Sequence, residues 1–184
     1  MKQLFTLAII LGAMWANADG GNFITKSGSI TFYSSASLED IQATSNQVTS
    51  VVNTVTGAVA FKALMKSFQF EKALMQEHFN EKYVESDKFP FTTFKGKITD
   101  MTAVNFEKDG TYPVVVTGDI SLHGVSKNIS ATGSITIKEN TLIVSSTFKL
   151  TVADFNIKIP GAVKDNIAKV VEVTVSGTYE PLKK

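Results

Sequence analysis

The 184-residue sequence contains no cysteine and no arginine. Without cysteine the fold has no disulfide bonds. The chain is also not a lipid-anchored bacterial lipoprotein, because the mature form of such a protein begins with cysteine. Without arginine, no site can hold a carboxylate or phosphate through the planar guanidinium fork. Bidentate recognition of an anionic headgroup is therefore not expected.

Residue types that carry catalysis or bind metals are also scarce. The two histidines are His78 and His123, and neither has a second histidine at the spacing of a zinc site. We interpret His123 as a polar turn residue and His78 as a solvated helix residue between Glu77 and Glu81. The sequence has no G-x-S-x-G motif and no glycine-rich phosphate-binding loop. It therefore predicts a protein that is not an enzyme and uses no cofactor or metal.

The first residues have the three parts of a cleavable secretion signal. Lys2 supplies the positive charge, Leu4–Trp15 form an apolar run, and Ala16-Asn17-Ala18 is an A-x-A cleavage site. An uncleaved membrane anchor is the alternative, but a run of about a dozen residues is shorter than the roughly 20 that span a bilayer. We expect residues 1–18 to be a signal peptide and residues 19–184 to form one domain. The mature protein is expected to be periplasmic or secreted, without stable membrane insertion.

Charge narrows the range of partners. Removing Lys2 with the signal brings the formal net charge from +1 to zero. A chain without a basic excess has no general attraction to a phosphate backbone, so nucleic acid is not an expected partner. We expect a monomer, with a dimer as the alternative.

Apolar and polar residues alternate with a period of two along most of the chain. Sustained alternation predicts antiparallel strands with one face in a core and the other in water. The rows of inward residues, taking every second position, are Ile30–Ser34, Phe61–Met65, Tyr112–Leu122, Ile129–Ile137, Leu142–Val152 and Val171–Tyr179.

The segments between these rows predict how the strands connect. Gly124–Lys127 and Lys138–Asn140 are short enough for hairpins, and Ser45–Ala60 is expected to form two more strands that turn near Thr56-Gly57. Counting all rows gives about eight strands, the number at which a closed barrel can hold one small ligand. Closure also removes exposed sheet edges.

Two segments break the alternation. Glu71–Tyr83 predicts a short amphipathic helix over one end of the barrel. Within Asp154–Lys169, a turn at Pro160-Gly161 precedes one or two expected helical turns over Ala162–Ala168. The predicted fold is therefore all-β, a single antiparallel barrel with one or two short helices.

Small residues occur among those that face the barrel interior. They are Ala63, Gly96, Gly118, Ala131, Gly133, Ser146 and Gly177. Small inward residues predict unfilled volume that an apolar ligand can occupy. The alternative is a packed core in which the glycines let strands bend. Gly133→Phe separates the two, because it should fill a cavity without loss of stability but overpack a filled core.

Three stretches resemble the YceI-like proteins. They are Glu71–Gly96, the hairpin sequence GDISLHGVSK at Gly118–Lys127, and FKLTVADFNIKI at Phe148–Ile159. The resemblance implies an extended lipocalin-like barrel whose long apolar cavity holds polyisoprenoid or other fatty-chain molecules in the bacterial periplasm. Members often carry an Arg-Asp pair ahead of the central histidine, where this chain has Leu74–His78. That departure favours a neutral headgroup, such as a quinone or a fatty amide.

Together these features predict an exported binding protein that transports, stores or sequesters an isoprenoid-like or other fatty-chain lipid. The alternative is an exported barrel with a packed core that acts through its surface as a stress or envelope interaction module. The lipid chain is expected along the barrel axis against Phe61, Met65, Phe94, Ile120, Leu122, Ile135, Val144 and Phe148. The residues expected near the entrance are Phe68, Phe70, Met75, His78 and Phe79. Met75 and His78 match family positions that we place near the ligand head.

Overall fold

The computed structural model describes residues 21–182, which form one antiparallel β-sheet of nine strands. The strands are β1 (Asn22–Ser35), β2 (Asp40–Asn53), β3 (Ala58–Leu64), β4 (Gln69–Phe70), β5 (Phe91–Ile98), β6 (Gly110–Leu122), β7 (Val125–Lys138), β8 (Thr141–Thr151) and β9 (Val170–Pro181). The predicted signal peptide, residues 1–18, lies outside the described residues. No helix within residues 21–182 is both long and apolar enough to cross a membrane.

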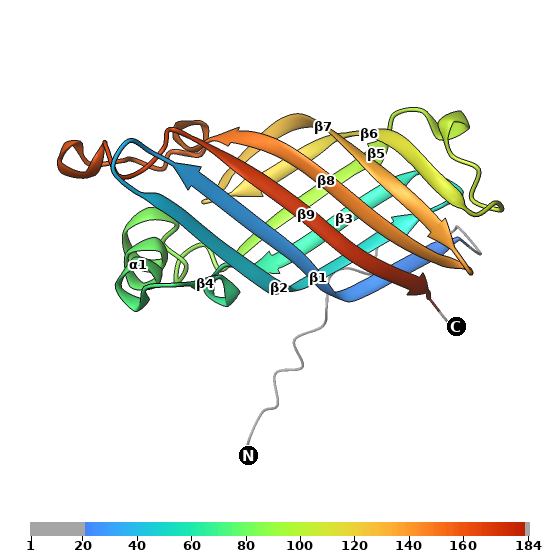
Figure 1. The fold of residues 1–184 in the computed structure, drawn as a ribbon, viewed down its shortest axis with the longest axis horizontal. Coiled ribbons are helices and arrows are strands. Elements are labelled where there is room, and N and C mark those ends of the chain that lie inside the picture. Colours follow the sequence, from blue (N-terminus) through green and yellow to red (C-terminus); the bar gives the residue numbers. More distant parts are fainter. Residues whose placement is uncertain (1–20, 183–184) are drawn as a thin grey trace, which may run out of the picture.

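The sheet closes on itself. Its order is β1-β9-β8-β7-β6-β5-β3-β2, and β1 also pairs with β2, so these strands form a ring. The two-residue strand β4 pairs only with the start of β2. Figure 1 shows the result as an elongated barrel with tilted strands. The predicted all-β antiparallel barrel is therefore confirmed.

Two hairpin turns are tighter than the sequence predicted. His123 and Gly124 join β6 to β7 with φ angles of 51° and 73°, and Glu139 and Asn140 join β7 to β8 with φ angles of 48° and 60°. Two successive positive φ angles are typical of the type I′ turn, whose twist matches that of the flanking strands. Both predicted hairpins are therefore present. Val125 already pairs with Leu122 and Lys138 with Thr141, so the turns are shorter than the predicted Gly124–Lys127 and Lys138–Asn140.

Most helical segments lie at one end of the barrel. Helix α1 (Ala73–His78) continues into the π-helical segment η2 (Phe79–Tyr83), so the predicted helix begins at Ala73 rather than Glu71. Short 3-10 turns η1 (Met65–Ser67), η4 (Val152–Phe155) and η5 (Gly161–Val163) lie between strands, and η3 (Met101–Ala103) follows β5. In Figure 1, α1 lies at the same end as the β1–β2 turn and the segment before β9.

The predicted helical turns over Ala162–Ala168 reduce to η5. Beyond it, the backbone groups bond to β1 and the β1–β2 turn instead of to a helix. The Asp165 carbonyl accepts from the Leu38 N–H at 2.9 Å, and the Ala168 N–H donates to Ser34 Oγ at 2.9 Å. These bonds fix the segment before β9 against the β1–β2 turn.

The barrel interior contains two apolar clusters. The cavity-side core comprises Ile30, Ala43, Val48, Ala63, Met65, Phe68, Val84, Phe94, Ile120, Leu150, Phe155, Ile157 and Val173. The far core comprises Val52, Ile98, Val104, Val114, Ile135, Ile137, Leu142 and Tyr179. Val59 and Val116 pack against both clusters and mark their junction.

Glycines on the inward rows bring strands together rather than leaving space. Gly96 on β5 is paired with Gly118 on β6, and a Cβ on either would collide with the backbone of the other strand. A Cβ on Gly133 would lie 2.5 Å from the Ser145 carbonyl oxygen. The interpretation of these three glycines as unfilled volume is therefore wrong. Their lack of a side chain allows close approach of neighbouring backbones.

Candidate ligand-binding cavity

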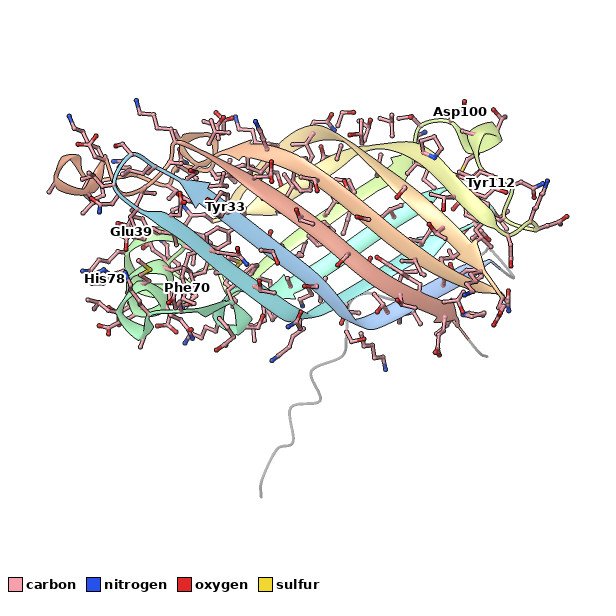
Figure 2. The ribbon with its side chains drawn as sticks, in the orientation of Figure 1. Tyr33, Glu39, Phe70, His78, Asp100 and Tyr112 are labelled. Carbon is pink, nitrogen blue, oxygen red and sulfur yellow. The ribbon has the colours of Figure 1, made fainter. Side chains whose placement is uncertain are left out.

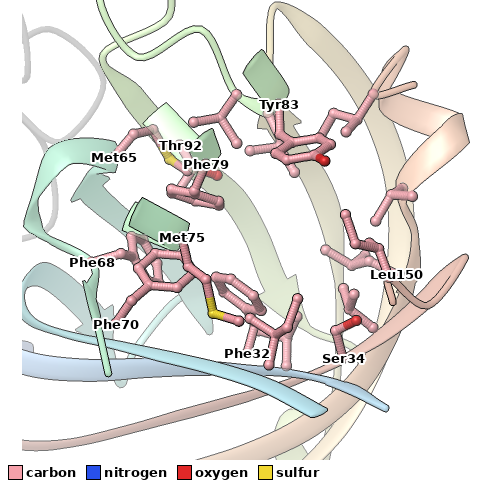
Figure 3. A pocket seen from close by; sticks show the side chains of 18 of the residues that line it. Phe32, Ser34, Met65, Phe68, Phe70, Met75, Phe79, Tyr83, Thr92 and Leu150 are labelled. Atoms are coloured by element: carbon pink, nitrogen blue, oxygen red, sulfur yellow. The ribbon is translucent and has the colours of Figure 1, made fainter. Parts of the chain in front are cut away.

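One end of the barrel contains an apolar cavity of about 320 Å³. Its opening is surrounded by α1, the β1–β2 turn and the segment before β9, and the close-up in Figure 3 shows apolar side chains projecting into it. Figure 2 places Glu39, Phe70 and His78 at this end and Asp100 and Tyr112 at the other. The volume is near the lower end of the roughly 300–1,000 Å³ typical of small-molecule sites.

Most of the cavity wall comes from alternate residues of four strands, and Ile41, Phe61, Phe70 and Thr92 add single side chains from β2, β3, β4 and β5. Because side chains of a strand alternate between faces, every second residue of β1, β6, β8 and β9 reaches the interior. These wall residues are Ile30, Phe32 and Ser34 from β1, Ile120 and Leu122 from β6, Phe148 and Leu150 from β8, and Val171 and Val173 from β9. The segment between β8 and β9 adds Val152, Ile157, Ile159, Val163 and Ile167.

An aromatic cluster fixes α1 and η2 to the barrel. The ring centroid of Phe79 lies 5.4 Å from that of Phe32, 5.0 Å from that of Phe70 and 5.8 Å from that of Phe68. Aromatic pairs at such distances each contribute about 0.5–1.5 kcal/mol beyond their buried area. Phe79 is thus the side chain that anchors the helical segment across the mouth of the barrel.

Glu39 connects the three segments around the opening. Its carboxylate accepts from Lys72 Nζ at 2.9 Å and from Asn166 Nδ2 at 3.4 Å. The hydrogen bond from Lys72, assisted by that from Asn166, holds the pKa of Glu39 below its ordinary value. The same contact raises the pKa of Lys72. We call Glu39, Lys72 and Asn166 the clasp, since they join the β1–β2 turn to the start of α1 and to the segment before β9.

Tyr83, the last residue of η2, also lines the cavity. In Figure 3 its phenol oxygen is directed into the cavity. Burial raises the pKa of the Tyr83 phenol above its ordinary value, so the neutral hydroxyl form is favoured. Within residues 21–182 the hydroxyl has no protein hydrogen-bond partner.

Two hydroxyl groups of the lining are already bonded within the protein. Thr92 Oγ1 donates to the Ser121 carbonyl at 3.0 Å, and Ser34 Oγ accepts from the Ala168 N–H. Within the described part of the chain, no group of three histidine, aspartate or glutamate side chains is arranged to hold a metal ion. The arrangement is suited to holding an apolar molecule.

Most of the sequence-predicted site residues meet at this cavity. Its lining includes Phe61, Met65, Phe68, Phe70, Met75, His78, Phe79, Ile120, Leu122 and Phe148. Three others do not line it. Phe94 lies in the cavity-side core, where its ring stacks on that of Phe61 from the neighbouring strand. Ile135 belongs to the far core, and Val144 packs against the far core.

Sequence reasoning missed part of the lining. The period-two rows already contained Ile30, Phe32, Val171 and Val173, and a full count of inward residues at that end would have found them. Tyr83, Glu39 and Asn166 carry no such signal, because their positions depend on how the connecting segments fold over the opening.

Three solved structures with the same fold are compared with this chain. A polyisoprenoid binding domain from Saccharophagus degradans, implicated in plant cell wall breakdown, is 14% identical with a TM-score of 0.75, covering 88% of this chain and 99% of that one. Burkholderia cenocepacia BcnA is 12% identical with a TM-score of 0.69, covering 83% and 95%. A mutant Campylobacter jejuni YceI protein with a monobromobimane guest is 15% identical with a TM-score of 0.56, covering 75% and 82%.

No curated protein compared with the chain is detectably similar in sequence. A family model described as the YceI-like domain, however, matches residues 18–179. This match extends from before β1 into β9 and so includes every strand of the closed barrel. The resemblance noted in the sequence is thereby confirmed, and the chain belongs to the YceI-like family.

Proposed function

We propose that this protein is an exported binding protein that holds a neutral, isoprenoid-like or other fatty-chain molecule in its cavity for transport, storage or sequestration. The observation that carries the proposal is the apolar cavity of about 320 Å³ at one end of a closed barrel. A barrel that acted only through its outer surface would not need such a cavity.

The physical basis of binding is the transfer of apolar surface out of water. Each buried CH₂ group contributes about 0.8 kcal/mol, before the cost of immobilising the ligand. Phe32, Ile120, Phe148 and Val173 present such surface from different strands. The barrel fixes these side chains before a ligand arrives. Binding therefore has only a small entropic cost from ordering the side chains of the site.

The comparisons support the class of ligand. The Saccharophagus degradans neighbour is described as a polyisoprenoid binding domain. For export, the support is the sequence of Lys2, the apolar run Leu4–Trp15 and Ala16-Asn17-Ala18. N-terminal sequencing of the mature protein should then begin at Asp19, in the periplasm or outside the cell.

A matched pair of variants on β9 tests binding. Val173→Trp places a large side chain in the cavity, whereas Ser176→Trp places it on the exposed outer face of the same strand. Native mass spectrometry of freshly purified wild type should show co-purified apolar molecules. Val173→Trp should lose them and Ser176→Trp should keep them. A wild type that neither carries such molecules nor binds the apolar fluorophore N-phenyl-1-naphthylamine would contradict the proposal.

A further inference from the structure

We propose that the outer surface of β3 and β5 docks on an anionic lipid bilayer, where Phe91 enters the interface and Lys62, Lys95 and Lys97 meet the lipid phosphates. We call these four residues the basic patch. The docking is peripheral, and no strand or helix crosses the bilayer. The patch is separate from the cavity, so this inference goes beyond the proposed function.

Charge is unevenly distributed around the barrel. β3 and β5 together contain three lysines and no acidic residue, and β2 carries no charge after Asp40. By contrast, β8, β9 and β1 together contain two lysines and two glutamates. One side of the barrel therefore has a local positive excess, although the predicted mature chain has a net charge of zero. Such a side attracts an anionic surface that the protein as a whole does not attract.

Strand register places the three lysines together on the outer face. Lys62, Lys95 and Lys97 are all exposed. Lys62 is opposite Thr93, which precedes Lys95 by two residues on the same face of β5. Residues two apart on a strand lie about 7 Å from each other, and neighbouring strands lie about 5 Å apart. The three ammonium groups can therefore contact neighbouring headgroups of one bilayer.

The lysines of the basic patch are available for such contacts. Within residues 21–182 none of the three forms an ion pair with a carboxylate, whereas Lys66 and Lys72 do. Asp119 is opposite Lys95 in the register of β5 and β6, but its carboxylate accepts from Asn128 at 2.8 Å instead. Lysine binds phosphate as a point charge, so the lack of arginine in this chain is no obstacle.

Phe91 supplies the apolar part of the basic patch. It begins β5, is 43% exposed and is opposite Leu64 at the end of β3. Lys62 Nζ lies 3.7 Å from the centroid of its ring. An aromatic ring flanked by lysines suits the boundary between headgroups and acyl chains, because the ring enters the apolar layer while the ammonium groups reach the phosphates. A soluble polyanion would leave the ring in water, so the exposed ring favours a bilayer.

The basic patch and the cavity are on opposite faces of the same wall. Phe61, next to Lys62, and Thr92, next to Phe91, point inward and line the cavity. Met65, which follows β3, lines it as well. Phe91 therefore lies at the cavity end of the barrel. Docking through the patch holds the cavity beside a bilayer, the phase in which fatty-chain molecules dissolve.

Sedimentation with sucrose-loaded vesicles tests the docking. Vesicles of phosphatidylcholine with about one third phosphatidylglycerol provide the anionic surface, and pure phosphatidylcholine provides the neutral one. Wild type should bind only the anionic vesicles. Binding should be lost as ionic strength rises from about 0.1 M to about 1 M, because the screening length falls from about 10 Å to about 3 Å.

Lysine variants test which charges are responsible. Lys62→Gln, Lys95→Gln and Lys97→Gln should each weaken binding to the anionic vesicles about fivefold. Lys138→Gln is the matched control, because Lys138 is an exposed lysine beside the β7–β8 turn at the other end of the barrel. It should bind as wild type does. Equal losses in the control and in the patch variants would overturn the inference.

Phe91→Thr tests the apolar contact and should weaken binding severalfold without changing its dependence on salt. Val115→Thr is its control, because Val115 is 39% exposed beside Thr99, at the opposite end of β5 from Phe91. Full binding by Phe91→Thr, competition by dextran sulfate in solution that is as strong as that by anionic vesicles, equal binding to neutral vesicles, or no binding of wild type to anionic vesicles would each overturn the inference.

The fluorophore N-phenyl-1-naphthylamine separates this inference from the proposed function. Its binding, measured without vesicles, should be the same in wild type and in every variant of the basic patch, because these side chains point away from the cavity. Unchanged fluorophore binding also shows that the variants are folded. A wild type that docks on anionic vesicles but binds no apolar molecule would retain the docking surface and reject the proposed function.

Discussion

Glu85 and His123 are joined by a hydrogen bond of 2.8 Å between Oε2 and Nε2, although 38 residues separate them in the sequence. The other ring nitrogen of His123, Nδ1, lies 2.9 Å from the Phe155 carbonyl oxygen. The ring of His123 is therefore held between a carboxylate oxygen and a carbonyl oxygen, both of which accept hydrogen bonds. The contact joins the β6–β7 turn to η4 and to the segment that follows η2.

Lowering the pH should weaken the contact between Glu85 and His123, because it protonates the Glu85 carboxylate. The hydrogen bond from His123 lowers the pKa of Glu85 from its ordinary value of 4.5, and Lys88 lowers it further. A carboxyl group whose pKa is lower in the folded state stabilises the fold above its unfolded pKa, and this contribution is lost as pH falls through the lowered value. Between pH 7 and pH 3, wild type should therefore lose more unfolding free energy than Glu85→Gln.

Denaturant titrations at a series of pH values measure this difference. Glu107→Gln removes an exposed carboxylate at the other end of the barrel and serves as the control. Its pH profile should follow that of wild type. Parallel profiles for wild type and Glu85→Gln would show that the Glu85–His123 bond contributes nothing to stability.

His123→Asn should lower stability for a reason separate from the turn itself. His123 has a φ of 51°, and asparagine accepts positive φ better than most residues, so the turn is preserved. The shorter amide cannot reach both Glu85 and the Phe155 carbonyl. The loss of these bonds should cost about 1–3 kcal/mol of unfolding free energy.

Glu139→Asn is the matched control for that variant. Glu139 is the first residue of the other type I′ turn, has a φ of 48° and is exposed. Because asparagine is favoured in such turns, the substitution should leave stability unchanged or raise it slightly. Denaturant unfolding measures both variants. If both lost the same free energy of unfolding, turn geometry rather than the contacts of His123 would be the cause.

Local periodicity was sufficient to predict the barrel. Alternation on β6, β7, β8 and β9 depends only on which face of a strand is buried, and the structure follows it residue by residue. The hairpin boundaries were wrong because a type I′ turn needs only two residues, and Val125 carries no signal that distinguishes a loop from a strand. Of the one or two helical turns predicted over Ala162–Ala168, only the short turn η5 forms, because Asp165 and Ala168 bond to Leu38 and Ser34 instead.

The site was harder to predict, because its features arise from contacts between distant segments. His123 was interpreted as a polar turn residue, yet its side chain is 11% exposed and its partners are 38 and 32 residues away. The alternation also gives no information on which end of the barrel is filled. Ile135 satisfies the inward pattern as well as Ile120 does, but only Ile120 borders the cavity.

Glycine substitutions distinguish close strand contact from empty space. A Cβ at Gly118 would collide with Gly96 and with the Lys95 carbonyl, whereas a Cβ at Gly161 meets no atom within 4 Å. Gly118→Ala should therefore lower the free energy of unfolding by about 1–3 kcal/mol, and Gly161→Ala should leave it nearly unchanged. Gly133→Phe should also destabilise the protein, contrary to the cavity interpretation of that residue. A fully stable Gly118→Ala would contradict the close contact of β5 and β6.

The clasp should govern access to the cavity more than global stability. Glu39 bonds to Lys72 and Asn166 at the surface, and exposed ion pairs contribute only about 0–1 kcal/mol. Glu39→Gln should therefore change the melting temperature little. Because the same contacts join α1 to the two other segments around the opening, their loss should increase local opening there. Amide hydrogen exchange over Ala73–Tyr83 should become faster, and N-phenyl-1-naphthylamine should bind and dissociate faster.

Lys66→Met separates this effect from the loss of any surface ion pair. Lys66 bonds to Asp87 at 2.6 Å, and neither residue lines the cavity. Exchange over α1 and the kinetics of the fluorophore should remain those of wild type in this variant. The fluorophore passes through the same opening when it binds and when it dissociates. Removing the clasp should therefore raise the association rate and the dissociation rate together and leave the equilibrium affinity close to that of wild type. Unchanged exchange over Ala73–Tyr83 in Glu39→Gln would mean that aromatic packing around Phe79 alone holds the helical segment in place.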